Sequence, residues 1–131
     1  MSLTSPDDPR VTHHYADVGE VLLHYVTAGD GFPVVMIHGY PQTWWEWRHQ
    51  IPALSEKYTV ITPDMRGLGD SSRPQSGYDK KTIADDIWRM VNGELGHDSF
   101  YLVGHDWGGP TAYALAAAHP EAVKRLVIID V

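Results

Sequence analysis

Apolar residues along the chain alternate between short continuous runs and one stripe with helical spacing. A continuous run is typical of a strand covered on both faces of a sheet, whereas an apolar residue at every third or fourth position is typical of an amphipathic helix. After Asp79, the side chains of Ile83, Ile87, Met90 and Val91 fall on one such stripe. We therefore predict strands over 32–39, 58–64, 99–105 and 123–131, and helices within 43–57, from residue 79, and over 108–119.

The chain begins with a different pattern. Two short β-rich runs, 12–19 and 20–29, are divided at Gly19, which favours an antiparallel pair. Residues 65–79 are rich in Gly, Ser and Pro and are predicted to form a loop. An antiparallel start followed by strand–helix alternation predicts an α/β fold with a mostly parallel sheet and helices on both faces. Because the last predicted strand ends the chain, we expect an exposed sheet edge and a fold truncated after that strand.

Composition narrows the class of protein. A length of 131 residues with 43% hydrophobic residues suits one domain, for which we expect a flexible leader over 1–12 and a folded part over 13–131. The net charge of −7 argues against nucleic-acid partners and anionic membrane surfaces. No cysteine is available for disulfides or thiolate chemistry, and no apolar run has the length of a membrane span. We expect a soluble, cytoplasmic protein.

The clearest candidate for chemistry is the pattern Gly104-x-Asp106-x-Gly108 between a predicted strand and a predicted helix. A sharp strand–turn–helix connection can push one side chain above the sheet, and its neighbours must be small because backbone passes close on both sides. An aspartate there is ionised near neutral pH and can attack a saturated carbon without a base, forming an ester that water can cleave. The alternative is that Asp106 only caps the following helix.

A second candidate follows the strand over 32–39. His38, Gly39, Tyr40 and Pro41 form a strand-end loop that can present a backbone N–H to a developing oxyanion. The two donors would be the N–H groups of Tyr40 and Trp107, and Tyr40–Pro41 is a candidate cis peptide. The alternative is an ordinary loop that contains an X–Pro bond.

Four segments together resemble the α/β-hydrolase superfamily, in particular its branch of epoxide hydrolases and haloalkane dehalogenases. They are HGYPQTWWEWRHQIPAL, VITPDMRGLGDSS, GHDWGG and HPEAVKRLVIID. The resemblance implies that Asp106 is the nucleophile and that Tyr40 and Trp107 form the oxyanion hole. It also implies that Asp64 and Arg66 form a structural turn. The residues that would support the elbow and loop are His38, Gly39, Pro41, Gly104, His105, Gly108 and Gly109.

Asp130 ends the last predicted strand. Dehalogenases and some epoxide hydrolases place the acid of the catalytic triad at this point, so the resemblance makes Asp130 a candidate. The alternative is a strand-terminal residue that bonds a neighbouring loop. The resemblance implies no cofactor. His13, His14 and His24 could suggest a metal site, but together they do not form a convincing set of ligands, so we expect no metal.

The resemblance favours a small hydrophobic epoxide as substrate, with a halogenated compound as the alternative. The Trp107 indole could bind a leaving halide, but many dehalogenases carry asparagine where this chain has Tyr40. Haloacetate dehalogenases carry arginines in place of Trp107 and Pro110. Trp44, Trp45 and Trp47 could line an apolar pocket or pack in the core.

The resemblance implies that the histidine that activates water and the lid domain would lie beyond Val131, the last residue of this chain. His38 and His105 are unconvincing as bases, since His38 belongs to the loop and His105 should point away from Asp106. We therefore expect no multiple turnover from this chain alone. Two alternatives remain: a non-catalytic half-domain that self-associates through its exposed sheet edge, and an enzyme whose remaining part is missing from this chain.

Overall fold

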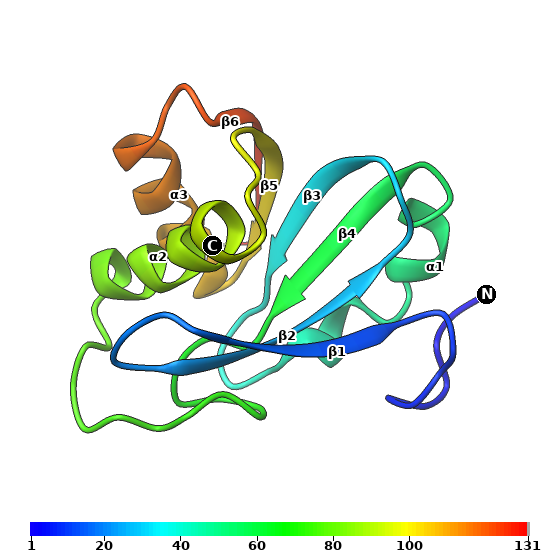
Figure 1. Ribbon diagram of the computed structural model, residues 1–131, viewed down its shortest axis with the longest axis horizontal. Coiled ribbons are helices and arrows are strands. Elements are labelled where there is room, and N and C mark those ends of the chain that lie inside the picture. The colour runs from blue at the N-terminus through cyan, green and yellow to red at the C-terminus, as the bar shows by residue number, and fades with distance from the viewer. Residues whose placement is uncertain (131) are drawn as a thin grey trace.

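The computed structural model describes residues 1–130. Six strands form one sheet in the order β1-β2-β4-β3-β5-β6 (Figure 1). β1, β2 and β4 pair antiparallel, whereas β4, β3, β5 and β6 pair parallel. The predicted α/β class and the antiparallel start are therefore confirmed. The strands are β1 (Thr12–Asp17), β2 (Leu22–Ala28), β3 (Phe32–Ile37), β4 (Tyr58–Pro63), β5 (Phe100–His105) and β6 (Val123–Ile129).

Helices cover both faces of the sheet, as predicted. α2 and α3 lie together on one side of the sheet, and α1 lies on the other (Figure 1). Pro52 lies in the first turn of α1, where its missing N–H costs no helical hydrogen bond. The helices are the 3₁₀ helix η1 (Trp44–Trp47), α1 (Ile51–Leu54), α2 (Lys80–Trp88), the π-helix η2 (Arg89–Glu94) and α3 (Gly108–Ala118).

Two separate apolar cores result from the alternation of side chains along the strands. On β3, Val35 and Ile37 belong to the core beneath α2 and α3, whereas Val34 and Met36 belong to the core beneath η1 and α1. Trp44 and Trp47 are 5% exposed and pack in this second core, so they do not line a pocket. Leu3 and Val11, from the segment for which we predict a flexible leader, are buried in the same core.

The helix predicted from residue 79 begins where expected. Asp79 caps α2, because its carboxylate accepts the backbone N–H of Thr82 at 3.1 Å. Of the predicted stripe, Ile87, Met90 and Val91 are completely buried. Beyond Trp88 the helix widens into η2, a change of pitch that the sequence pattern does not predict.

β6 lies at one edge of the sheet, as predicted. Its apolar side chains Leu126, Val127, Ile128 and Ile129 are 36%, 50%, 42% and 42% exposed. Within residues 1–130, the helices are all too short or too polar to cross a lipid bilayer.

Candidate active site

The turn between β5 and α3 raises Asp106 above the carboxyl end of the parallel strands. Its φ angle is 54°, in the left-handed region that few non-glycine residues adopt and that Asp and Asn tolerate best. The Asp106 carbonyl accepts the N–H of Gly109 at 2.9 Å, and its own N–H donates to the Ile129 carbonyl at 3.2 Å. The turn is thus attached both to α3 and to the end of β6.

Close backbone approaches explain the glycines of this turn. A Cβ on Gly104 would overlap the carbonyl oxygen of Gly108, and a Cβ on Gly108 would overlap the carbonyl oxygen of Ile37. A Cβ on Gly39 would lie 2.6 Å from the Asp106 Cβ. The predicted crowding on both sides of Asp106 is therefore confirmed, and a third glycine, from the β3 loop, is under the same constraint.

Two backbone N–H groups face the Asp106 carboxylate. The N–H of Tyr40 donates to Oδ2 at 3.2 Å, and the N–H of the adjacent Trp107 also favours the ionised carboxylate. These donors, Trp107 first and Tyr40 second, lower the pKa of Asp106 against a smaller opposing effect of burial. The N-cap position of α3 is Trp107, which makes no side-chain cap, so the Asp-cap alternative is wrong.

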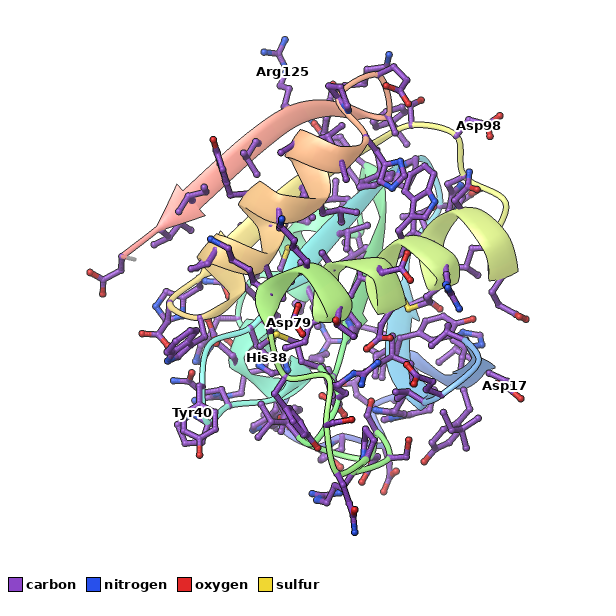
Figure 2. The ribbon with its side chains drawn as sticks, turned by 90° about the vertical axis from the view of Figure 1, so that its left-hand side faces the viewer. Asp17, His38, Tyr40, Asp79, Asp98 and Arg125 are labelled. Carbon is purple, nitrogen blue, oxygen red and sulfur yellow. The ribbon has the colours of Figure 1, made fainter. Side chains whose placement is uncertain are left out.

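His38 stabilises the loop after β3 from the interior of the protein. Its imidazole is completely buried, with Nδ1 2.7 Å from the Gly39 carbonyl and Nε2 accepting the Met65 N–H at 3.0 Å. Burial lowers the pKa of His38, in agreement with a neutral ring that donates at one nitrogen and accepts at the other. Tyr40–Pro41 is cis, as predicted. Figure 2 shows His38 inside the molecule and Tyr40 at its surface.

Glu46 also belongs to this site, although the sequence analysis did not identify it. Its Oε1 accepts the N–H of Gly39 at 2.9 Å, and its Oε2 lies 2.6 Å from His105 Nδ1. The contact with His105 lacks the alignment of a hydrogen bond. The sequence signal for Glu46 is its place among three tryptophans, because an acidic side chain in an apolar segment needs a polar partner.

Asp130 lies at the same end of the sheet as Asp106. The register of β5 and β6 pairs His105 with Ile129, so the next residue on each strand is one of the two aspartates. Asp130 is exposed and, like Asp106, has a positive φ angle, of 52°. The structure thus brings the backbones of the two predicted site residues to the ends of adjacent strands.

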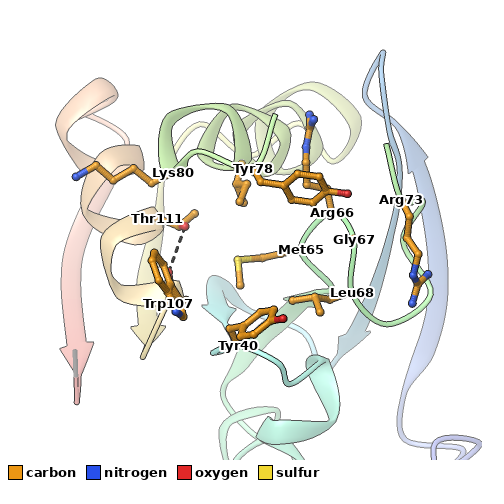
Figure 3. A pocket seen from close by; sticks show the side chains of 11 residues that line it. Tyr40, Met65, Arg66, Gly67, Leu68, Arg73, Tyr78, Lys80, Trp107 and Thr111 are labelled. Atoms are coloured by element: carbon orange, nitrogen blue, oxygen red, sulfur yellow. Dashed lines mark hydrogen bonds between the residues drawn. The ribbon is translucent and has the colours of Figure 1, made fainter. Parts of the chain in front are cut away.

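A pocket of about 560 Å³ opens beside the turn (Figure 3). Tyr40 and Trp107, each 63% exposed, form the wall nearest to Asp106. The rest of the lining is apolar or basic and comes mainly from the loop after β4 and from α2. The other lining residues are Met65, Arg66, Gly67, Leu68, Arg73, Tyr78, Lys80, Ile83 and Thr111.

Away from the pocket, His24, Asp64 and Asp70 form a group with the spacing of metal ligands. The ligand atoms of His24 and Asp64 are already used in internal hydrogen bonds, and Asp70 is exposed. His24 Nδ1 lies 2.7 Å from Asp64 Oδ2, and the N–H groups of Trp44 and Asp70 also donate to the Asp64 carboxylate, at 2.8 and 3.0 Å. His13 Nδ1 in turn lies 2.9 Å from His24 Nε2. These contacts fit a structural hydrogen-bond network better than a metal centre.

Known proteins resemble the chain in sequence and structure. Soluble epoxide hydrolase from Corynebacterium sp. (strain C12) is 50% identical over 121 residues, which cover 92% of this chain and 42% of that protein. Fluoroacetate dehalogenase from Burkholderia sp. is 38% identical over 120 residues, which cover 88% and 39%. The solved structure of epoxide hydrolase CorEH without ligand superposes with a TM-score of 0.87 at 51% identity, over 90% of this chain and 41% of that one.

The chain thus spans less than half the length of these relatives. The family model described as alpha/beta hydrolase fold matches residues 33–131, which include the strand-end loop at Tyr40 and the turn at Asp106. Sheet order, turn geometry and sequence agree, and the chain belongs to the alpha/beta hydrolase fold family.

Proposed function

We propose that this chain carries the nucleophile and oxyanion hole of an epoxide hydrolase. The observation that carries the proposal is an ionised aspartate in a left-handed turn at the strand ends, faced by the backbone N–H groups of Tyr40 and Trp107. The same two residues line the adjacent pocket. The relatives named epoxide hydrolases support the same assignment. The substrate class is a small hydrophobic epoxide.

The first step forms an ester. The Asp106 oxygen that does not accept the Tyr40 N–H attacks an epoxide carbon, the carbon–oxygen bond of the ring breaks, and the released oxygen takes up a proton from solvent water. The product is a 2-hydroxyalkyl ester of Asp106. Because the carboxylate is already ionised, this step needs no general base.

The second step uses the same N–H groups. Water attacks the ester carbonyl, and negative charge develops on Oδ2, to which the Tyr40 N–H donates at 3.2 Å in the free site. The N–H groups of Tyr40 and Trp107 stabilise this oxyanion. Cleavage of the acyl–oxygen bond then restores the carboxylate. One proton of the attacking water goes to the departing oxygen, which leaves in the diol, and the other passes to solvent. We assign His38, Gly39, Pro41, Gly104, His105, Gly108 and Gly109 to the support of this geometry, and Asp130 to the acid that would orient a base.

A haloalkane or haloacid dehalogenase is the second candidate. The exposed Trp107 indole beside the pocket could donate to a leaving halide, and a relative is named fluoroacetate dehalogenase. Asp106 would then displace halide from carbon and form the same type of ester. Tyr40 stands where many dehalogenases carry asparagine, and this difference favours an epoxide as the substrate.

Trapping of the ester tests the proposal. The chain is incubated with styrene oxide, and intact mass spectrometry follows the addition of one epoxide. We expect one adduct, located on the peptide that contains Asp106, and no diol in excess of protein. Asp106→Asn should abolish the adduct, whereas Asp30→Asn, at an exposed turn, should not.

An adduct of equal yield in Asp106→Asn would overturn the assignment of the nucleophile. Sustained diol release that depends on Asp106 would instead overturn only the expectation of a single turnover. Parallel incubation with 1-bromobutane measures the dehalogenase alternative, because faster ester formation from the bromide than from the epoxide would favour it.

A further inference from the structure

Glu46 connects the two segments that build the site. The residue lies on η1, and its carboxylate is largely buried, with 15% of the side chain exposed. One oxygen accepts the N–H of Gly39 at 2.9 Å, and the other lies 2.6 Å from Nδ1 of His105. The carboxylate thus bridges the loop after β3 and the end of β5.

Each of these contacts is one residue away from a group of the site. Gly39 precedes Tyr40, whose N–H donates to Asp106, and His105 precedes Asp106 itself. A hydrogen bond to the Gly39 N–H fixes one peptide plane, and the next peptide plane carries the Tyr40 N–H. The separation between the donor and the carboxylate therefore depends on the geometry at Glu46.

The surroundings of Glu46 hold it in place. Thr43 caps η1 by accepting the Trp45 N–H at 3.2 Å, and the flanking Trp44 and Trp47 are buried in the second core. The Trp47 ring also packs edge-on against the His105 ring, with centroids 6.4 Å apart. Because its helix is anchored on both sides, Glu46 can hold the two segments at little further cost in conformational entropy.

We propose that Glu46 is a positioning residue that aligns the Tyr40 N–H with the oxyanion formed on Asp106. The inference rests on the proposed function, since it concerns the second step of that reaction. The Glu46 carboxylate contacts Gly39 and His105, so its effect on the chemistry is exerted through their neighbours Tyr40 and Asp106.

The test measures cleavage of the trapped ester by hydroxylamine. The amine nitrogen attacks the ester carbonyl, the acyl–oxygen bond breaks, the diol leaves with a proton, and Asp106 becomes a hydroxamate. This reaction passes through the oxyanion at Oδ2 but needs no histidine. Its rate constant therefore reports the alignment of the N–H donors directly.

Glu46→Ala should slow this cleavage by about tenfold or more, because a misdirected oxyanion donor loses much of its effect. Glu46→Gln keeps an oxygen for the Gly39 N–H and should recover most of the rate. Amide hydrogen exchange at Gly39 and Tyr40 should be faster in Glu46→Ala only. Glu56→Ala, which removes an exposed glutamate, is the matched control and should leave the cleavage rate and the exchange unchanged.

The outcomes separate the two proposals. If the unmodified chain forms no ester on Asp106, the proposed function fails, and the role of Glu46 fails with it. If the ester forms and Glu46→Ala cleaves as fast as the unmodified chain, only the role of Glu46 is overturned. If Glu46→Ala does not fold, Glu46→Gln decides, because a tenfold loss there despite a native melting temperature would contradict the hydrogen-bond account.

Discussion

Arg66 and Asp86 form a bidentate ion pair, in which Nε and Nη2 of the guanidinium each donate to a different carboxylate oxygen at 2.7 Å. Both side chains are buried, and Asp86 raises the pKa of Arg66. Arg66 also donates to the Ser76 carbonyl at 2.9 Å. The pair therefore attaches α2 to the loop over 65–79, which lines one side of the pocket.

Removal of Asp86 should leave a buried guanidinium whose remaining acidic neighbour is the exposed Glu20, 3.9 Å away. We expect Asp86→Ala to lower the free energy of unfolding by about 3 kcal/mol, as for other broken buried pairs. Urea denaturation measures this. Asp85→Ala is the control, because its pair with Arg89 is about half exposed and should contribute no more than about 0.5 kcal/mol. Equal losses in the two variants would contradict a specific role of the buried pair.

The hydrogen bonds of Asp64 predict a particular acid sensitivity. Burial opposes its ionisation, but donors from His24, Asp70 and Trp44 outweigh that effect and lower its pKa. Because the pKa of Asp64 is lower in the folded state, its ionised form stabilises the fold at pH values above 3.8, the ordinary pKa of an aspartate. This stabilisation is lost as the pH falls from 3.8 through the lower, folded-state pKa.

Asp64→Asn should therefore be less stable than the unmodified chain at pH 7, and the difference should shrink below pH 3.8. Denaturant titrations across the acid range measure the difference. A difference that stays constant at all pH values would show that ionisation of Asp64 does not contribute.

The lowered pKa of Asp106 predicts how ester formation depends on pH. Since the Trp107 and Tyr40 N–H groups favour the carboxylate, the nucleophile should remain ionised down to values below 3.8. The rate of adduct formation should be flat through neutral and mildly acidic pH and fall only below the ordinary carboxyl value. A midpoint above 3.8, the ordinary value for an aspartate, would contradict the effect of these N–H groups.

The exposed apolar face and open edge of β6 predict self-association of this chain. Light scattering should show a mass that rises with concentration. Ile128→Lys should reduce this rise, whereas Tyr15→Lys, on β1 at the other edge, should not. A constant monomer mass at all concentrations would contradict the prediction.

The strands and the turn at Asp106 could be predicted because their signals are local. Continuous apolar runs mark β3, β4 and β5, and the glycines at 104 and 108 surround one aspartate. The steric reason inferred from the sequence holds, since each glycine faces a backbone oxygen that a Cβ would overlap.

The contacts of Glu46 and the pocket could not be predicted, because both depend on segments distant in the chain. Glu46 contacts residues 39 and 105, and the pocket combines the turns at 40 and 107 with the loop after β4. The widening of α2 into η2 was also missed, since the same apolar stripe suits either helical pitch.

Within residues 1–130, the sheet divides the apolar interior into two cores that share no side chain. Ile87 lies in the core beneath α2 and α3, and Ile51 lies in the core beneath η1 and α1. The truncations Ile87→Ala and Ile51→Ala should each lower the free energy of unfolding. In the double variant the two losses should sum to within about 0.5 kcal/mol. The face that carries η1 and Glu46 can thus be redesigned without loss of packing energy beneath α2 and α3.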